Sequence, residues 1–206
     1  MSKATQTDAM GSIQRGIKRT LDFVMSALGL ILLSPIFIII SVLMKFQGNG
    51  PIFFRQIRIG YKGKPFVILK FRTISKKTEK NTPQLIAKTS CKSSTPFEKF
   101  LREHHLDELP QLWNVLVGDM SLVGPRPERK YFIDKIMEHT DLYPIIYNMR
   151  PGLTSEATLY NGYTDTMEKM LKRLQMDINY FERRSLWLDF KIIIKTFVNI
   201  VSGNKF

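Results

Sequence analysis

Hydrophobic and polar positions divide the chain into one long apolar segment and a series of shorter, mixed elements. No charged residue occurs between Phe23 and Met44, and about 20 apolar residues are enough for a bilayer helix. Basic residues precede the segment as in a signal peptide, but the apolar run is too long for one and no small-residue cleavage site follows it. We therefore predict a retained membrane anchor. The alternative is a buried helix of a soluble protein.

A proline interrupts this segment near its middle. Pro35 lacks a backbone donor and its ring clashes with the preceding turn, so Ser34-Pro35 predicts a kink between two half-helices. The Ser34 hydroxyl is a candidate partner for a carbonyl that the proline frees. Both flanks are basic, so neither end is favoured to cross, and each half is roughly 16 Å long, about half a bilayer. We predict a re-entrant helix-break-helix over residues 13–46 after a flexible tail, residues 1–12. A kinked spanning helix is the alternative.

The remaining chain, residues 47–206, has the pattern of a folded cytosolic domain. Two β-type runs, residues 52–59 and 66–73, are separated by a turn with Gly and Pro and predict a small hairpin. A period of two puts Lys70 and Arg72 on one face of its second strand. The polar stretch from Ser75 to Ser94 is predicted to be a mobile loop.

Helical signals follow. Thr95-Pro96-Phe97-Glu98 has the spacing of a capping box with proline at the first helical position. Further helices are expected from near Asp107 through Leu116 and from about residue 128 to 138, whereas residues 118–127 and 150–154 are expected to be irregular because of their Gly and Pro content. The fold class predicted is α+β, mostly helical.

Two amphipathic helices are expected near the C-terminus. Apolar residues recur at helical spacing between Thr166 and Glu182. The stretch Ser185–Val201 is apolar apart from Asp189 and one polar stripe, and Trp187 lies near its start. This pattern is typical of a helix in a membrane interface. A core helix with a solvated stripe is the alternative.

Composition narrows the class of protein. The 206 residues include 31 Lys and Arg against 18 Asp and Glu, a formal charge of +13. Such an excess favours an anionic partner, which could be nucleic acid, a phospholipid surface or a phosphorylated substrate. A single cysteine excludes a disulfide framework and a cysteine-based zinc site.

The densest cluster of candidate chemistry is the acidic pair Asp107-Glu108. An acidic pair before an apolar run is usually a helix N-terminus, where it caps the free amides. A functional alternative exists, because a helix N-terminus binds anions and a carboxylate is a nucleophile that needs no general base at neutral pH.

Cations and one further acid could complete a site. Arg126, between Pro125 and Pro127, is either part of a rigid surface turn or a preorganised donor for a phosphate. Lys70 and Arg72 could add two cations. Adjacent His104 and His105 point about 100° apart on a helix and are better explained as solvated side chains than as metal ligands. Asp177 lies at the edge of its helix's apolar stripe, where it faces either solvent or a cleft.

These motifs, taken in order, resemble the small monotopic polyprenyl-phosphate sugar-phosphate transferases, the phosphoglycosyl transferases that begin bacterial glycan assembly. The resemblance covers nearly the whole chain. The segments that carry it are Lys18-Arg19 with Asp22, Ser34-Pro35, Lys70-Phe71-Arg72-Thr73, Leu101-Arg102, residues 106–112, 118–127 and 150–154, and Trp187-Leu188-Asp189. One departure follows residue 154: members commonly read Gly-Trp-Ala-Gln-Val-Asn-Gly-Arg, where this chain has Ser155-Glu156-Ala157-Thr158-Leu159-Tyr160-Asn161-Gly162-Tyr163.

The resemblance implies a two-step reaction. Asp107 would attack the sugar-linked phosphorus of a UDP-sugar and release UMP, and polyprenyl phosphate would then accept the sugar phosphate from the aspartate. Glu108 would bind Mg²⁺ and Arg126 a substrate phosphate. The positions that match further polar residues of the family are Lys70, Arg72, Arg102 and Asp177.

The implied setting is the cytoplasmic face of a bacterial inner membrane. The expected partners are a UDP-sugar, undecaprenyl phosphate or another polyprenyl phosphate, and anionic lipid, but not nucleic acid; a homodimer is left open. Two other classes compete with this function. A membrane-anchored basic binding module would account for the charge but not for the acidic pair, and a Mg²⁺-dependent phosphohydrolase of lipid diphosphates would transfer to water.

Overall fold

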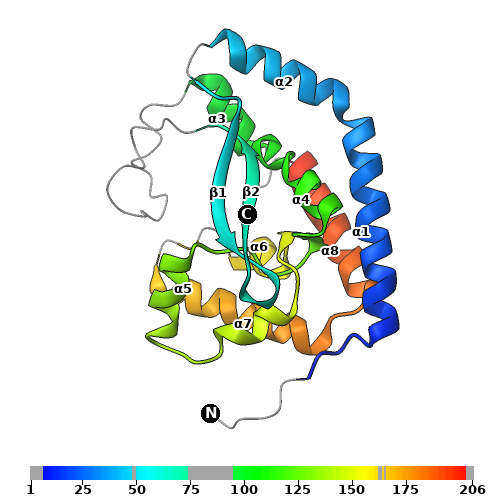
Figure 1. The fold of residues 1–206 in the computed structure, drawn as a ribbon, viewed down its shortest axis with the longest axis vertical. Helices are drawn as coiled ribbons and strands as arrows, with labels where there is room; N and C mark the ends of the chain where they lie inside the picture. Colours follow the sequence, from blue (N-terminus) through cyan, green and yellow to red (C-terminus); the bar gives the residue numbers. More distant parts are fainter. Residues whose placement is uncertain (1–6, 48–49, 74–94, 162–163, 165, 203–206) are drawn as a thin grey trace.

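A long helix and a shorter one, joined by a bend, form one side and the top of the molecule in Figure 1. The computed structural model describes residues 7–47, 50–73, 95–161, 164 and 166–202. Within these residues the chain is mostly helical with two small sheets, so the α+β prediction is confirmed. The loop predicted between Ser75 and Ser94 lies outside the described residues.

The break predicted at Ser34-Pro35 is present. Helix α1 (Ser12–Leu32) and helix α2 (Ser34–Phe46) are bent by 57° relative to each other. Pro35 has no N–H for the carbonyl of Ile31, and the Ser34 hydroxyl donates to that oxygen at 2.7 Å. None of the described helices is by itself long and apolar enough to cross a membrane, whereas the bent pair together meets that requirement by length and composition.

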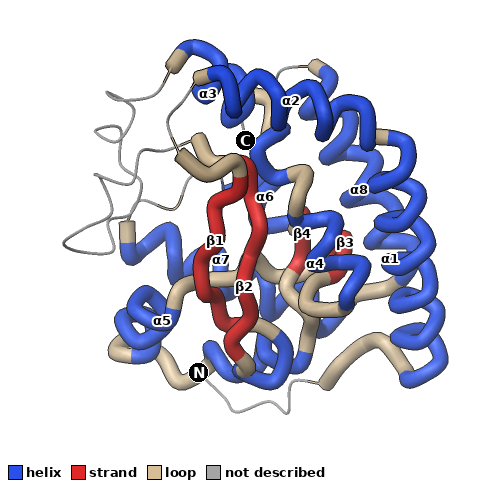
Figure 2. Tube along the Cα trace, turned by 45° about the horizontal axis from the view of Figure 1, so that its top comes forward, coloured by secondary structure: helices blue, strands red, loops and turns tan. Residues whose placement is uncertain are grey.

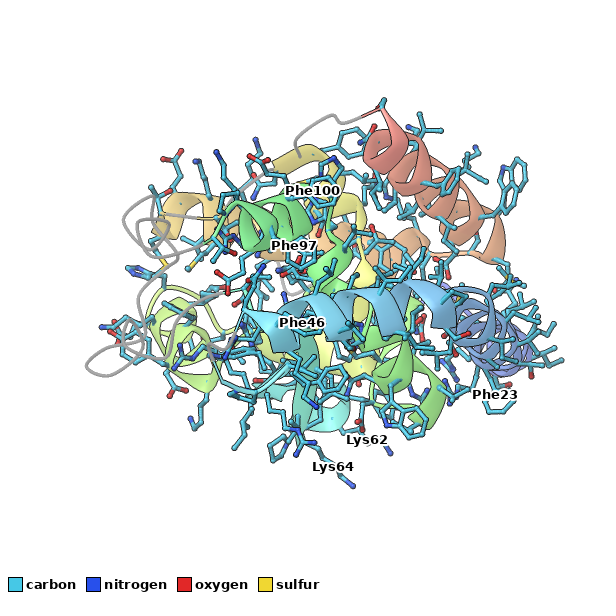
Figure 3. The ribbon with its side chains drawn as sticks, turned by 90° about the horizontal axis from the view of Figure 1, so that it is seen from above. Phe23, Phe46, Lys62, Lys64, Phe97 and Phe100 are labelled. Atoms are coloured by element: carbon cyan, nitrogen blue, oxygen red, sulfur yellow. The ribbon has the colours of Figure 1, made fainter. Side chains whose placement is uncertain are left out.

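Burial in α1 is reversed relative to an ordinary surface helix. The buried residues of α1 are polar, Asp22 and Ser26, while its apolar side chains face outward, Leu32 with 75% of its surface exposed. Helix α2 ends in Phe46, which is 85% exposed. Figure 3 shows Phe46 at the end of α2 and Phe23 on α1, well apart from each other. A continuous apolar outer face of this size indicates an interaction surface rather than a water-exposed one.

The N-terminal segment is held from residue 8 onward. Asp8 accepts hydrogen bonds from Arg184 and from Arg15, each at 2.7 Å, and Met10 is buried. The prediction of a flexible tail over residues 1–12 is therefore wrong from Asp8 onward. It could not include this contact, because the counter-ion of Asp8 is Arg184, near the other end of the sequence. Residues 1–6 lie outside the described residues.

The predicted hairpin is confirmed. Strand β1 (Phe53–Ile59) pairs antiparallel with strand β2 (Pro65–Phe71) around the turn η1 (Tyr61–Gly63). Phe71, at the end of β2, packs in a cluster with Ile40 and Met44 of α2. The hairpin crosses the molecule in front of the other elements in Figure 2, and its second strand runs from the η1 turn toward the α2 end, where Phe71 lies.

A second sheet was not predicted. Strand β3 (Ser121–Val123) pairs in parallel with strand β4 (Gly152–Thr154). The expectation that residues 118–127 and 150–154 are irregular is wrong at these six positions. Strands of three residues are too short to show an alternating pattern, and the glycines and prolines of the surrounding segments, such as Gly124 and Pro151, are typical of turns.

The other helices largely follow the prediction. The capping box at Thr95 begins α3 (Pro96–Glu103). The remaining helical elements are η4 (Leu106–Glu108), α4 (Gln111–Val117), α5 (Lys130–Met137), η5 (Tyr143–Asn148), α6 (Glu156–Asn161), α7 (Met167–Arg183) and α8 (Leu186–Val201). The main core joins α5, η5, α7 and α8. Helix α8 buries Ile192 and exposes Trp187 and Phe197.

Candidate active site

The acidic pair lies in a single turn, η4, between α3 and α4 and beside β2. His105 precedes it in the left-handed conformation, with φ at 54°. Helix α4 begins only at Gln111, after Pro110, and no side chain caps it. The prediction of a helix starting near Asp107 is therefore wrong, because proline favours the start of a helix and α4 begins there. The acids are accordingly placed by a turn, and cations rather than helix amides face them.

Glu108 is held by two cations from different segments. Its Oε1 accepts from Lys70 Nζ at 2.5 Å and from Arg126 Nη2 at 3.2 Å. Burial alone would raise the pKa of Glu108, but these two cations hold it well below its usual range. Glu108 is therefore a fixed carboxylate at neutral pH.

Asp107 is in a different state. It is 9% exposed and accepts no hydrogen bond from the residues that the structure describes. Burial and the charge of Glu108 raise the pKa of Asp107 to about 6, against the influence of the nearby cations. Asp107 is thus ionised for most of the time at neutral pH, more basic than an ordinary aspartate, and not hydrogen-bonded to any described side chain.

Close backbone packing fixes the loop that carries Arg126. Gly124 N donates to Thr154 O at 3.1 Å, and Gly152 N donates to Pro125 O at 2.9 Å. A Cβ on Gly124 would lie 2.3 Å from Arg150 O, and one on Gly152 would lie 2.2 Å from Gly124 N. Only glycine allows this approach. The short β3–β4 sheet therefore presents Arg126 toward Glu108 from a preformed loop.

Two further predicted cations are placed differently. Arg102, on α3, donates to the carbonyl oxygen of Thr73, and its charge acts on the pKa of Asp107. Arg72 is buried just beyond the end of β2, where a Cβ on Gly50 would lie 2.7 Å from its Nη1. The structure thus brings Arg102 to the acidic pair, together with Lys70 and Arg126, but within the described residues it does not bring Arg72 there.

A second charged cluster lies on the other side of Arg126. Glu128 accepts from Arg58 Nη1 at 3.4 Å and from Arg173 Nη1 at 3.0 Å. Arg58 Nη1 also donates to Pro127 O at 3.1 Å. Burial lowers the pKa of Arg58 to about 10. This cluster joins β1 and α7 to the loop directly after Arg126.

Asp177 belongs to this second cluster. It is 3% exposed on α7 and lines a small pocket with Arg126, Glu128 and Arg173. Burial raises the pKa of Asp177 to about 7, although Arg173 opposes the rise. The sequence left open whether Asp177 faces solvent or a cleft, and in the structure it faces a cleft.

Sequence reasoning missed three members of this cluster, Arg58, Glu128 and Arg173. Arg58 and Arg173 carry no local signal, because a basic residue on a strand or helix is usually solvated. The position of Glu128, two residues after Arg126, was the only available indication. Ion pairs between distant segments cannot be found from spacing alone.

The described residues contain no group of three His, Cys, Asp or Glu side chains that could hold a metal ion by themselves. His104 instead packs against Phe100 with the two rings tilted, their centroids 4.2 Å apart. Mg²⁺ is commonly bound by one or two carboxylates together with substrate phosphates. The carboxylate of Glu108 fits that donor set, whereas a site built from protein ligands alone does not occur in the described part of the chain.

Comparison with known proteins gives consistent matches. Residues 13–203 match the family described as bacterial sugar transferases. The chain is 40% identical over 190 residues to the UDP-glucose:undecaprenyl-phosphate glucose-1-phosphate transferase of Klebsiella pneumoniae, covering 91% of this chain and 40% of that protein. A protein of the same name from Caulobacter vibrioides is 40% identical over 188 residues, covering 90% of this chain and 70% of that protein.

A third relative acts on a different sugar by its name. The UDP-N-acetylgalactosamine-undecaprenyl-phosphate N-acetylgalactosaminephosphotransferase of Aeromonas hydrophila is 35% identical over 187 residues, covering 91% of this chain and 44% of that protein. This chain therefore spans less than half the length of the relatives from Klebsiella and Aeromonas. The matches support a shared catalytic region and leave the sugar open.

Proposed function

The chain belongs to the bacterial sugar transferase family, and we propose that it transfers a sugar 1-phosphate from a UDP-sugar to a polyprenyl phosphate and releases UMP. The names of the relatives support these substrate classes, since they combine undecaprenyl phosphate with UDP-glucose or UDP-N-acetylgalactosamine. Such a transfer would be the first membrane step of glycan or glycoconjugate assembly.

The observation that carries the proposal is the asymmetry of the acidic pair. Glu108 is neutralised by Lys70 and Arg126, while Asp107 accepts no hydrogen bond from a described residue and has a raised pKa. A carboxylate in this state is a suitable nucleophile, because it is mostly ionised yet more basic than an ordinary aspartate. The surrounding cations would attract the diphosphate that it must attack.

The transfer would occur in two displacements at one phosphorus atom. A carboxylate oxygen of Asp107 would form a bond to the sugar-linked phosphorus, and the bond from that phosphorus to the bridging oxygen would break, so that UMP leaves with the electron pair. A phosphate oxygen of the polyprenyl phosphate would then attack the same phosphorus. The bond to Asp107 would break, which yields a polyprenyl diphosphate sugar and restores the carboxylate.

The cations would make this reaction between anions feasible. Arg126, held by the β3–β4 loop, would donate two N–H groups to one phosphate group in a planar arrangement. Lys70 and Arg102 would offset the negative charge that accumulates on the phosphoryl oxygens. Because both nucleophiles are already anions, no Ser/His/Asp arrangement is needed.

Mg²⁺ is the cofactor that we propose. Glu108 would hold it together with the diphosphate, and the ion would supply charge stabilisation at the phosphoryl oxygens. Asp107 would stay available as the nucleophile.

We further propose that α1 and α2 enter the membrane and return to the cytoplasmic face of the bacterial inner membrane, while α8 lies in the interface. The outward apolar surfaces of these helices and their basic flanks support this arrangement. With Cys91→Ser as background, single cysteines would be introduced at Thr5 and Asn204. An impermeant thiol reagent should label neither in intact cells and both after lysis. Labelling of Thr5→Cys in intact cells would show a spanning helix instead.

UMP release in the absence of lipid tests the function. The purified full chain in detergent, with Mg²⁺ and a panel of UDP-sugars, should release about one UMP per active site with one of the sugars and then stop until polyprenyl phosphate is added. Continuous release without lipid would indicate the phosphohydrolase. Absence of release with every sugar would leave only the binding module.

A further inference from the structure

Three polar residues on one side of α1 each bind a different segment of the catalytic domain. They lie within five residues of one another, and their partners are 96 to 171 residues away in the sequence. Figure 1 shows α1 running along the domain beside α4 and α8. An anchor helix needs no such contacts merely to bind a membrane. These contacts also fix the position of α1 relative to the segments of the catalytic domain that it touches.

Two of the three contacts concern the ends of helices. Arg19 donates to the carbonyl oxygens of Val115 and Leu116 at 2.7 and 2.8 Å, at the C-terminus of α4, which follows the acidic pair. Lys18 forms an ion pair with Asp189 of α8 at 2.5 Å. Both contacts place a positive charge where it is favourable, at a helix C-terminus or beside a buried acid.

The third contact reaches the loop that carries Arg126. Asp22 is 4% exposed, and its Oδ1 accepts from the backbone N–H of Leu122 at 3.0 Å. Leu122 is the central residue of β3, whose register with β4 pairs its neighbours Ser121 and Val123. Asp22 therefore satisfies the edge of β3 that β4 does not cover, where a backbone donor would otherwise be buried without a partner.

We propose that Asp22 is a positioning residue for Arg126, through which the membrane anchor fixes the geometry of the phosphate-binding loop. Leu122 precedes Arg126 by four residues, and the segment between them is rigid because Gly124 is packed against Gly152 and Pro125 restricts the backbone. A shift of β3 along α1 is therefore transmitted to the guanidinium. This role in catalysis rests on the proposed function, whereas the contact itself does not.

Two substitutions at Asp22 separate the hydrogen bond from the charge. Asp22→Asn keeps a side-chain oxygen that can accept from Leu122 N, and Asp22→Ala removes it. Ser26→Ala is the matched control: Ser26 is also buried on α1, one turn further on, but among the described residues its hydroxyl bonds within the helix, to Phe23 O at 3.0 Å. If Asp22→Ala yields no folded protein, Asp22→Glu takes its place, because the longer side chain displaces the accepting oxygen.

The measurements are the rate constant of the UMP burst and amide exchange at residues 121–124, both on the full chain in detergent. The burst rate constant does not depend on the fraction of folded protein, which changes only the amplitude. We expect Asp22→Ala to slow the burst by about tenfold or more, since small misplacement of a binding group has effects of this size. The same variant should accelerate exchange at Leu122. Asp22→Asn and Ser26→Ala should stay within about threefold of wild type in both.

Each other result overturns the inference. Unchanged exchange in Asp22→Ala would show that Asp22 does not hold β3. Faster exchange with a wild-type burst rate would show that β3 does not position Arg126. An equal loss in Asp22→Asn and Asp22→Ala would assign the effect to charge instead of to the hydrogen bond. If wild type itself gives no burst with any UDP-sugar, the proposed function fails, while the exchange experiment still decides whether Asp22 fixes the loop.

Discussion

Two pairs of acids flank Arg126, and each contains an ion-paired glutamate and a buried aspartate. In the first pair Glu108 is held by Lys70 and Arg126, and the pKa of Asp107 is raised to about 6. In the second pair Glu128 is held by two other arginines, and the pKa of Asp177 is raised to about 7. Burial is the largest cause of the rise at both aspartates.

The two aspartates differ in the charges that surround them and in the backbone element that carries them. Three cations and one acid, Glu108, act on Asp107, whereas Asp177 is influenced by one cation, Arg173, and by two acids, Glu128 and Glu156. Asp107 lies in a single turn, and Asp177 lies in the 17-residue helix α7. The diphosphate of the proposed substrate would be attracted to the first cluster and would gain little from the second. A raised pKa alone therefore does not identify a nucleophile; the net charge around it does.

The largest difference between the pairs should appear when each aspartate becomes asparagine. Asp107→Asn removes the nucleophile while keeping the shape of the side chain, so turnover should fall by about a thousandfold or more. Asp177→Asn resembles the protonated acid, which is already well populated near neutral pH, so its loss should be less than about tenfold. Steady-state UMP release measures both. Similar losses of turnover in the two variants would show that Asp107 and Asp177 do not differ in their catalytic role.

The second cluster should matter more for stability. Glu128→Gln leaves Arg58 and Arg173 without their shared counter-charge, and breaking a buried ion pair costs about 3 kcal/mol. Thermal unfolding in detergent should show a clear decrease in midpoint. The control is Glu138→Gln, in the exposed pair with Lys135, where we expect a change below about 0.5 kcal/mol. Equal midpoints for both variants would mean that Glu128 does not hold the second cluster together.

Arg126 donates to Glu108 and lines the same small pocket as Glu128 and Asp177, and its replacement tests what the two pairs share. Arg126→Lys keeps the charge but loses the planar pair of donors, so we expect about a tenfold loss of specific activity, equivalent to roughly 1.4 kcal/mol. The apparent KM for the UDP-sugar should account for part of it. Near-normal kinetics would make Arg126 a structural residue of the loop.

The last difference concerns the pH dependence of stability. The folded-state pKa of Asp177, about 7, lies above its ordinary value of 3.8, so its protonated form stabilises the fold at low pH and this contribution is lost as the pH rises through 7. The Asp177→Asn variant does not lose this contribution, because its amide does not ionise. The difference in stability between the variant and wild type should therefore shift in favour of the variant by roughly 2 kcal/mol from about pH 5 to about pH 8. A pH-independent difference would contradict the raised pKa.

Much of the fold could be predicted because its signals are local. The break at Ser34-Pro35, the hairpin, the capping box at Thr95 and the helix over 167–183 each follow from neighbouring residues. The β3–β4 sheet could not be predicted, since it depends on a backbone approach between Gly124 and Gly152. The anchoring of Asp8 by Arg184 could not be predicted either, because it also joins segments that are far apart in the sequence.

The candidate site divides in the same way. Asp107, Glu108, Lys70, Arg102 and Arg126 were found from the sequence and lie together. Arg72 follows the end of β2 at Phe71, and within the described residues it does not lie with the acidic pair, so its role as a phosphate-binding cation stays a prediction. The contacts of Arg58, Arg173 and Asp22 link segments distant in sequence, and only the folded chain brings their partners into reach.

Intact-protein mass spectrometry tests the central claim most directly. The wild-type chain incubated with its UDP-sugar, Mg²⁺ and no lipid should gain the mass of one phosphosugar, and peptide analysis should locate it on Asp107. The Asp107→Asn variant should gain nothing, and polyprenyl phosphate should remove the adduct from wild type. An adduct on the asparagine variant, or one located on Asp177 or any other residue, would contradict the assignment of Asp107 as the nucleophile.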